Sequence, residues 1–206
     1  MLIRQLTGGS SPDRRKTAFS YFLRYRLDII LLQETHWTVD MEMEIKHKWN
    51  RDVIFNHGTN NAILIHSRLD YTVTQTRDDN VLNILLNLDG HVLNIINIYA
   101  PQTDSAHQTF FSSLVQFISE VDDTIIGGDF NCKANVKLDK TGGKQKIRHL
   151  AEASLQSMSL QFDLSDIWRD HHKDARAFIW TGRHPTDGSF ISTRIDKFLI
   201  SRTLNP

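Results

Sequence analysis

Apolar residues recur along this chain with two different spacings, and the spacing changes from segment to segment. Between residues 14 and 26, Phe19, Phe22 and Leu23 lie at the spacing of one helix face, which predicts an amphipathic helix. The same helical spacing recurs over residues 105–121 and 147–158. Short apolar runs bounded by polar or turn residues predict strands at 28–33, 52–56, 61–67, 70–76, 80–90, 91–101, 122–128, 178–181 and 193–201.

The order of these elements predicts an α+β fold. Several strands follow one another between residues 52 and 101, and Asp89-Gly90 is a hairpin signal between the last two. Runs of strands with helices interspersed favour a sheet packed on a sheet with helices outside. A chain of 206 residues, 40% hydrophobic and without a linker or repeat, is expected to form a single domain over residues 1–206.

The composition limits the cellular compartments in which this chain is expected. The only cysteine, Cys132, cannot form an intramolecular disulfide, which favours a nuclear or cytoplasmic location. The first residues lack the apolar centre of a signal peptide, and no apolar stretch approaches the ~18 residues of a membrane span. The ten histidines match no zinc-binding spacing.

The formal net charge is zero, but one segment is strongly basic. Residues 133–148 contain six lysines and arginines against one acid, Asp139. Lys133, Lys137 and Lys140 could bind phosphate groups of a nucleic acid. The other interpretation of this basic segment is a solvated loop.

Polar side chains that could perform chemistry lie at the ends of apolar runs or inside them. These residues are Glu34, Tyr99, Asp129, Asn131 and Asp196. Each also has a structural explanation: Asp and Asn beside glycine form turns, Glu34 could be an ion-pair partner, Tyr99 a packed aromatic, and Asp196 a surface partner of Arg194. Because strands would place all five at one edge of a two-sheet sandwich, we expect them to converge on one cleft.

Four motifs in this order resemble the endonuclease/exonuclease/phosphatase superfamily: LLQETHW, NIYAP, GGDFN and TRIDKFLIS. The stretches GGDFN…LD.TG and DIWR…FIWT are most similar to the endonuclease domains of LINE-type retrotransposons, which are relatives of apurinic endonucleases. The likeness extends from Ile3 to Ser201. It implies a four-layer α/β/β/α sandwich of the DNase I-like type and a monomer that hydrolyses DNA phosphodiester bonds.

The resemblance also implies a role for each candidate residue. Glu34 would hold Mg²⁺ or Mn²⁺, and Asp129 would orient or deprotonate the attacking water. Asn131 would donate to the scissile phosphate, and Tyr99 would add a second donor. Asp196 would fix the tautomer of a histidine. The two glycines of GGDFN would let the chain turn sharply against the phosphate.

Two departures from the family pattern affect the residues of the expected site. A terminal strand with a Ser-Asp-His motif, which supplies that histidine, does not follow TRIDKFLIS, and Leu2 stands where relatives carry asparagine. We therefore expect a fold without its C-terminal strand and impaired hydrolysis, because a positioned acid or base contributes ~10²–10⁴-fold. The alternatives are a noncatalytic nucleic-acid- or protein-binding domain, or a phosphatase of the same superfamily.

Overall fold

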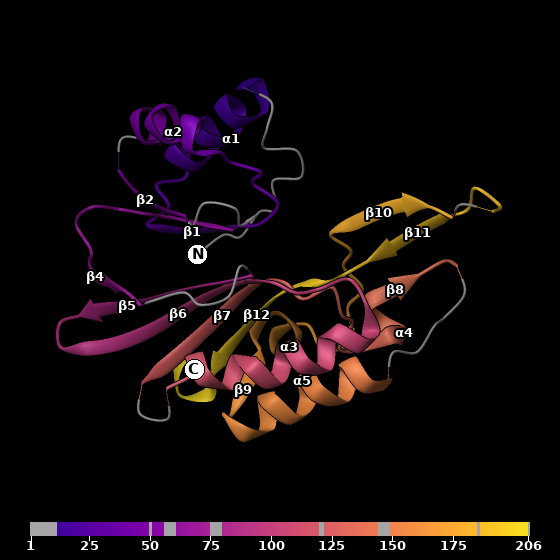
Figure 1. Cartoon of the computed structure of the whole chain (residues 1–206). Helices are drawn as coiled ribbons and strands as arrows, with labels where there is room; N and C mark the ends of the chain where they lie inside the picture. Colours follow the sequence, from indigo (N-terminus) through magenta and orange to yellow (C-terminus); the bar gives the residue numbers. More distant parts are fainter. Residues whose placement is uncertain are drawn as a thin grey trace. The chain divides into compact units, whose positions relative to one another are not determined.

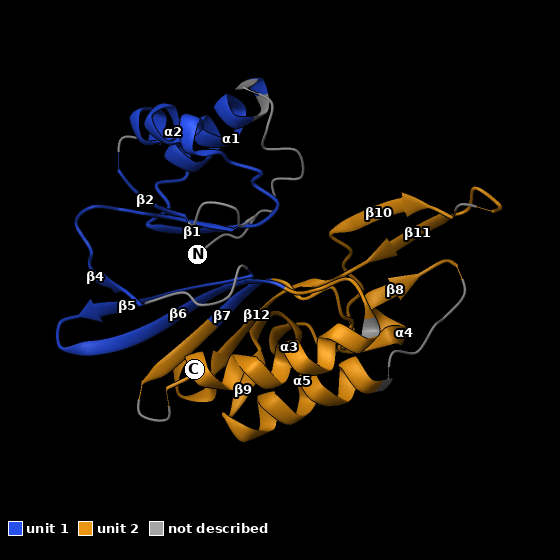
Figure 2. Ribbon diagram, viewed as in Figure 1, with its two compact units in different colours: residues 1–99, 126–128 blue, residues 100–125, 129–206 orange. Residues whose placement is uncertain are grey.

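The computed structural model describes residues 12–49, 51–55, 61–74, 80–119, 122–143, 149–184 and 186–205. These residues group into two compact units, coloured separately in Figure 2. Unit 1 comprises residues 1–99 and 126–128, and unit 2 comprises residues 100–125 and 129–206. That the two units form one domain stays a prediction.

Unit 1 combines helices with antiparallel strands (Figure 1). Its helices are α1 (Pro12–Arg24) and α2 (Glu42–Trp49), with the 3-10 turn η1 (Val39–Met41) before α2. One sheet has the order β1 (Ile29–Leu32), β3 (Ala62–Ile65) and β2 (Asp52–Phe55), with Ile29 opposite Ile65. A second antiparallel ladder joins β4 (Asp70–Val73), β5 (Val81–Leu88) and β6 (His91–Tyr99).

The core of unit 1 forms where aromatic side chains of the helices meet β1 and β3. Every residue of these two strands is buried. Phe19 of α1 and Trp49 of α2 have their ring centroids 6.2 Å apart and belong to the same buried cluster as Leu32 and Leu64. Burial of such large apolar side chains contributes about 1.5–3 kcal/mol each, so this cluster is a principal source of stability in unit 1.

The buried face of α1 differs from the expected one by one residue. Phe19 and Phe22 are buried as predicted, but Leu23 is 40% exposed. Arg15 is buried instead, because its position four residues before Phe19 is on the same face. Its guanidinium reaches Glu44 of α2 at 3.3 Å, so a charged side chain completes the face that Leu23 was expected to share.

The hairpin between β5 and β6 is confirmed. Asp89 and Gly90 have φ angles of 53° and 89°, and positive φ at both central residues is what a type I′ turn requires. Leu88 consequently pairs with His91 and Val81 with Ile98. Asn87 Oδ1 accepts a hydrogen bond from the Gly90 amide at 3.0 Å, which further fixes the turn.

Unit 2 contains the remaining elements. Its helices and helical turns are α3 (Asp104–Leu114), η2 (Val115–Phe117), α4 (Val136–Asp139), α5 (His149–Gln161), α6 (Ile167–His171) and η3 (Arg202–Leu204). Its strands are β7 (Asp123–Asp129), β8 (Lys140–Thr141), β9 (Leu164–Asp166), β10 (Trp180–Arg183), β11 (Phe190–Thr193) and β12 (Asp196–Ser201). The centre of β7, residues 126–128, is counted with unit 1.

Two sheets include strands of unit 2. One has the order β10-β11-β8, with Trp180 opposite Thr193 and Thr193 opposite Lys140. The other contains β7, β12 and β9 in that order, with Leu199 of β12 opposite Asp166 of β9. Helices α3 and α5 run alongside each other in unit 2 (Figure 1). No helix in the described segments is both long and apolar enough to cross a bilayer.

Several predicted elements of unit 2 have different bounds in the structure. The helix expected over residues 105–121 ends at Leu114 and tightens into η2, because its last turn becomes 3-10. The strand expected at residues 178–181 lies at Trp180–Arg183. The short elements α2, α4, α6, β8, β9 and β11 were not predicted.

Candidate active site

Glu34 and Tyr99, both in unit 1, are brought together. Glu34 follows strand β1 and Tyr99 is the last residue of β6. The Tyr99 hydroxyl donates to Glu34 Oε1 at 2.7 Å, and both side chains are partly buried. Glu34 has a φ of 52°, a left-handed conformation that non-glycine residues adopt rarely. Strain of this kind concentrates at functional sites, so it agrees with a chemical role for Glu34.

Two buried amides hold this pair's strands in place. Gln33 Nε2 donates to Asn97 Oδ1 at 2.5 Å, and both residues are fully buried. Asn97 Nδ2 in turn donates to the carbonyl oxygens of Leu32 and Ala62, each at 3.0 Å. This network joins β6 to both β1 and β3 directly before Glu34, which fixes where Glu34 begins to leave the strand. Gln33 and Asn97 were not predicted from the sequence, although amides inside apolar runs are a visible signal.

Asp129 and Asn131, in unit 2, also form a connected pair. Asp129 is buried, and its Oδ1 accepts the Asn131 backbone N–H at 2.7 Å. Asn131 Nδ2 donates to the carbonyl oxygen of Ala100 at 2.7 Å, and the Ala100 amide donates to the Asp129 carbonyl at 2.8 Å. Asn131 has a φ of 45°, so it is a second candidate residue in the left-handed region. The one-residue spacing therefore produces a tight, cross-linked turn.

The structure explains the glycine before Asp129 by a different constraint from the one expected. The sequence suggested that glycines let the chain turn against a phosphate. In unit 1, a Cβ on Gly128 would lie 2.0 Å from the carbonyl oxygen of Ile98, and its φ is 145°. Gly128 is thus required by the close approach of β7 to β6.

Asp196 begins β12 and is buried, but it is not a surface partner of Arg194. Arg194 is itself buried, and its guanidinium binds two other carboxylates. Its Nε donates to Asp139 Oδ1 at 2.9 Å, and its two terminal nitrogens donate to Asp166 at 3.2 and 2.6 Å. The alternative of an Asp196–Arg194 surface pair is therefore wrong.

The carboxylate of Asp139 is the centre of a buried ion-pair network that the sequence did not reveal. Besides Arg194, it accepts from Arg169 at 2.7 Å and from the Asn135 amide at 3.0 Å. Burial by itself would raise the pKa of Asp139, but the hydrogen bond and charge of Arg194 hold that pKa below its ordinary value. The network links α4 to the residues just before Asp196.

Lys133, Lys137 and Lys140 all belong to unit 2, around the short helix α4. Lys137 is exposed, whereas Lys133 and Lys140 are partly buried. Asn135 caps α4 through its side chain, which accepts from the amides of Lys137 and Leu138. Lys144, Lys146 and Arg148 lie outside the described residues. A role in DNA binding stays a prediction for this segment.

The donors among the described residues limit which metal ions the chain could hold. Within the part of the chain that the structure describes, no cluster of three or more His, Cys, Asp and Glu residues could hold an ion. Mg²⁺ keeps several waters and usually takes one or two protein carboxylates together with substrate phosphate oxygens. Glu34 fits that pattern, because Tyr99 binds only Oε1 and a carboxylate has a second oxygen. The residues present are therefore compatible with Mg²⁺ or Mn²⁺.

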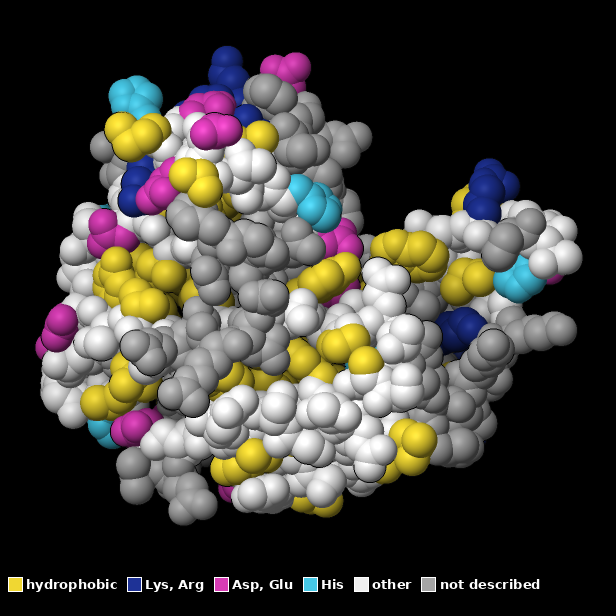
Figure 3. All heavy atoms as spheres, viewed as in Figure 1, with side chains coloured by type: hydrophobic (Ala, Val, Ile, Leu, Met, Phe, Trp, Pro, Cys, Tyr) yellow, Lys and Arg dark blue, Asp and Glu magenta, His cyan; other side chains and the backbone are white. Residues whose placement is uncertain are grey.

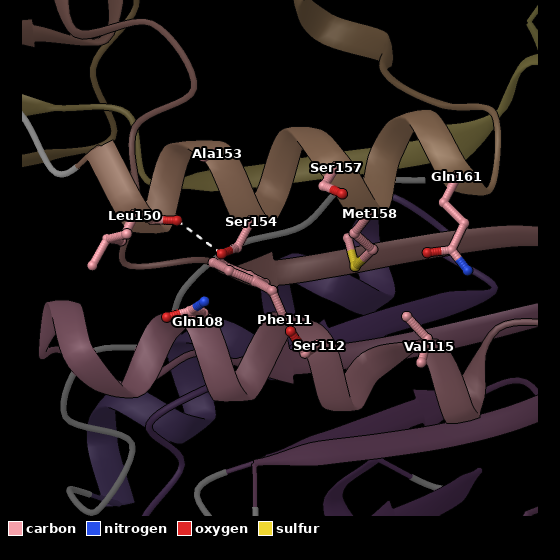
Figure 4. A pocket seen from close by; sticks show the side chains of 10 residues that line it. All are labelled: Gln108, Phe111, Ser112, Val115, Leu150, Ala153, Ser154, Ser157, Met158 and Gln161. Atoms are coloured by element: carbon pink, nitrogen blue, oxygen red, sulfur yellow. Dashed lines mark hydrogen bonds between the residues drawn. The ribbon is translucent and has the colours of Figure 1, made fainter.

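Unit 2 has two other surface features. A hollow of about 500 Å³ between α3 and α5 is lined by apolar side chains, among them Phe111, Leu150 and Met158, and by uncharged polar ones (Figure 4). None of the predicted site residues lines it. The β10–β11 hairpin shows hydrophobic side chains beside basic ones (Figure 3). There Phe190 is 62% exposed, and the Arg183 guanidinium lies 4.5 Å from the centre of its ring.

The predicted residues thus form two connected groups, one in each unit, and their convergence on one cleft stays a prediction. Glu34 and Tyr99 are bonded directly. Asp129 and Asn131 are bonded directly, and the Phe130 amide between them donates to the carbonyl of Ile195, the residue before Asp196, at 3.0 Å. The first residues, including Leu2, lie outside the described part of the chain.

Known proteins share both sequence and fold with this chain. The Endonuclease/Exonuclease/phosphatase family matches residues 5–206. A Xenopus laevis protein described as "Transposon TX1 uncharacterized 149 kDa protein" is 28% identical over 207 residues, covering 96% of this chain and 15% of that protein. The chain therefore spans a small part of this relative's length.

Two solved structures show the same fold at low sequence identity. The endonuclease domain of TRAS1, a telomere-specific non-LTR retrotransposon, has a TM-score of 0.66 at 12% identity, covering 98% of this chain and 84% of that one. An AP endonuclease from Archaeoglobus fulgidus has a TM-score of 0.71 at 17% identity, covering 99% and 88%. The predicted α+β fold of the DNase I-like type and the resemblance to LINE-type endonuclease domains are confirmed.

Proposed function

The chain belongs to the endonuclease/exonuclease/phosphatase family, and we propose that it is a nicking endonuclease that hydrolyses DNA phosphodiester bonds with the help of Mg²⁺ or Mn²⁺. The family and the nuclease folds that it resembles support nuclease-type hydrolysis. DNA as the substrate, the choice of ion and the residue roles are parts of this proposal. So are a monomeric state and a nuclear or cytoplasmic location.

The observation that carries the proposal is the cross-linked turn of Asp129 and Asn131. Hydrolysis needs an acceptor that orients water and a donor that binds the phosphate, held a short distance apart. The Asp129 carboxylate is such an acceptor. It accepts a hydrogen bond from the backbone N–H of Asn131 at 2.7 Å, and this bond fixes the spacing of the two residues. The side-chain nitrogen of Asn131 donates to the Ala100 carbonyl oxygen in this structure. A side-chain amide nitrogen carries two hydrogens, and we propose that it donates to a phosphate oxygen when DNA is bound.

Glu34 and Tyr99 are proposed to act in the same reaction. The backbone supports this, because Ala100, which is tied to both Asp129 and Asn131, directly follows Tyr99. Glu34 would hold the divalent cation through its carboxylate, while Tyr99 fixes the orientation of that carboxylate. When bound, the cation would neutralise phosphate charge and favour ionisation of the attacking water. Asp196 would fix the tautomer of a histidine, which is the role that the resemblance implies.

DNA as the substrate is supported by the charges and aromatic groups of unit 2. Lys133, Lys137 and Lys140 lie within the segment that continues from Asn131, where they could bind phosphates on either side of the reacting bond. Phe190, exposed and stacked with Arg183, offers a flat apolar surface beside a positive charge. Aromatic rings and arginine together suit contact with nucleic-acid bases and backbone.

The test is nicking of supercoiled plasmid by the 206-residue chain in Mg²⁺. We expect Asp129→Asn to lower the rate by about 10²–10⁴-fold, because it removes the group that orients or deprotonates water. Glu34→Gln should raise the Mg²⁺ concentration needed for half-maximal rate. Asp40→Asn is the control: it removes one exposed carboxylate near Glu34 in the sequence and should leave the rate unchanged.

Two outcomes would contradict the proposal. If the parent chain binds plasmid but does not nick it above background, the noncatalytic binding domain becomes the better interpretation. If Asp129→Asn nicks as fast as Asp40→Asn, the observation on which the proposal rests is wrong.

A further inference from the structure

Strand β12 places a lysine inside the core of unit 2. Lys197 follows Asp196 directly and is only 3% exposed, although lysine is among the residues least often buried. Its Nζ donates to the carbonyl oxygen of Cys132 and, at 3.5 Å, to that of Ile195. The ammonium also lies 5.5 Å from the centre of the Phe130 ring. Burial lowers the pKa of Lys197, so the folded chain holds this charge against a desolvation penalty.

The carbonyl that Lys197 binds belongs to the residue after Asn131. Asn131 has a φ of 45°, and such a conformation persists in a non-glycine residue only where the surroundings determine it. Its backbone N–H binds Asp129, and its side chain binds Ala100. Lys197 holds the peptide that follows. Contacts before, at and after Asn131 therefore fix its orientation together.

Neighbouring residues of a strand point to opposite faces, so the side chains of Asp196 and Lys197 lie on opposite faces of β12. The Lys197 side chain packs next to Phe130, which is fully buried. The Phe130 ring centroid lies 6.3 Å from that of Phe111 in α3. Phe130 and Lys197 therefore anchor the turn from the core side, while Asp129 and Asn131 flank Phe130. A lysine buried in this way cannot reach a substrate, so any effect on the reaction passes through the turn.

We infer that Lys197 is a positioning residue that holds Asn131, through the Cys132 carbonyl, in the geometry required for hydrolysis. This inference rests on the proposed function. A methionine at position 197 would fill a similar volume without the charge or the hydrogen bonds. If Lys197 only filled space, such a replacement would be harmless to the reaction.

The kinetic test compares Lys197→Met with Leu199→Ala in plasmid nicking, below the melting temperature of both variants. Leu199 lies two residues further along β12 on the same face and is also buried, so its truncation destabilises the strand without touching the Cys132 carbonyl. We expect Lys197→Met to lower kcat by about 10–100-fold with KM nearly unchanged, since a misplaced group loses reaction rate more than binding. Leu199→Ala should keep the parental kcat. Equal kcat values for the two variants would overturn the inference.

A second measurement does not depend on turnover. Hydrogen exchange of the amides of residues 130–133 should accelerate in Lys197→Met and not in Leu199→Ala, whose changes should instead affect β12 and its partner β9. Unchanged exchange at residues 130–133 in Lys197→Met would overturn the inference whether or not the parent chain nicks DNA. If the parent does not nick but this local acceleration is found, the proposed function fails while the anchoring by Lys197 stands.

Discussion

At the scale of single residues, unit 2 contains charged groups that are out of contact with water. Asp139 is fully buried and receives hydrogen bonds from Arg169, Arg194 and the Asn135 amide. A buried pair of this kind adds little net stability compared with apolar residues, because each charge loses its hydration. Removal of one partner, however, leaves the other charge buried with fewer compensating groups. The network therefore makes unit 2 sensitive to single substitutions near Asp196.

We predict that Asp139→Asn lowers the free energy of unfolding by about 3 kcal/mol at neutral pH, because the buried Arg194 then keeps only Asp166 as a carboxylate partner. Folding lowers the pKa of Asp139. Its contribution is therefore complete above the pKa of the unfolded chain and is lost as pH falls through the lower pKa of the folded chain. In urea unfolding, the difference between parent and variant should shrink below about pH 4.

Asp163→Asn is the matched control for this prediction. Asp163 also pairs with an arginine, Arg202, at 3.0 Å, but both side chains are largely exposed. An exposed ion pair contributes about 0–1 kcal/mol, so this variant should unfold almost like the parent at every pH. A loss in Asp139→Asn no larger than the loss in Asp163→Asn would show that the buried network does not stabilise unit 2.

At the scale of elements, the helices and strands that could be predicted from the sequence are those with a clear apolar periodicity or a turn signal. The β5–β6 hairpin was predictable because Asp89-Gly90 marks a turn between two long apolar runs. The end of α3 was not, because residues 114–118 contain neither glycine nor proline to mark it. The short helix α2 was missed since tertiary burial of Ile45 and Trp49, rather than a long periodic pattern, supports it.

The residues of the candidate site also divide into those that a local sequence pattern marks and those that depend on tertiary contacts. Glu34, Tyr99, Asp129 and Asn131 were predictable because each lies in a motif at the end of an apolar run, and the structure joins them in pairs. Lys197 and Arg194 lie in an equally visible motif, TRIDKFLIS, but a charged residue in a strand is ordinarily exposed. Their burial depends on partners 28 to 65 residues away in sequence, which no local pattern reveals.

Strand β7 gives a prediction at this scale. Gly128→Ala should lower the free energy of unfolding by about 3 kcal/mol or more, because the new Cβ would meet the Ile98 carbonyl and its φ of 145° disfavours any side chain. Gly90→Ala is the control, since its φ of 89° is also positive but no atom lies within 4 Å of the new Cβ. That variant should lose only about 1–2 kcal/mol. Equal losses in urea unfolding would mean that the close approach of β7 to β6 is not what requires glycine.

At the scale of the whole molecule, the net charge of zero gives no general attraction to DNA. Any electrostatic binding must therefore depend on where the basic residues lie. Lys133, Lys137 and Lys140 belong to the segment of residues 133–148, which has six basic residues against one acid. The position of a charge, rather than the total charge, should then control affinity.

We predict that Lys133→Gln, Lys137→Gln and Lys140→Gln together weaken binding to duplex DNA and flatten its salt dependence. Each phosphate that a lysine neutralises contributes about −0.9 to the slope of log affinity against log salt, so the loss of three contacts should reduce the slope by as much as about 2.7. The control replaces Lys16, Arg24 and Lys173 with glutamine, three exposed residues outside the basic segment. Both variants have the same net charge, so a general charge effect would change their slopes equally. Measured by fluorescence anisotropy over a salt series, only the first variant should differ from the parent, and an unchanged slope would identify residues 133–140 as a solvated surface segment without phosphate contacts.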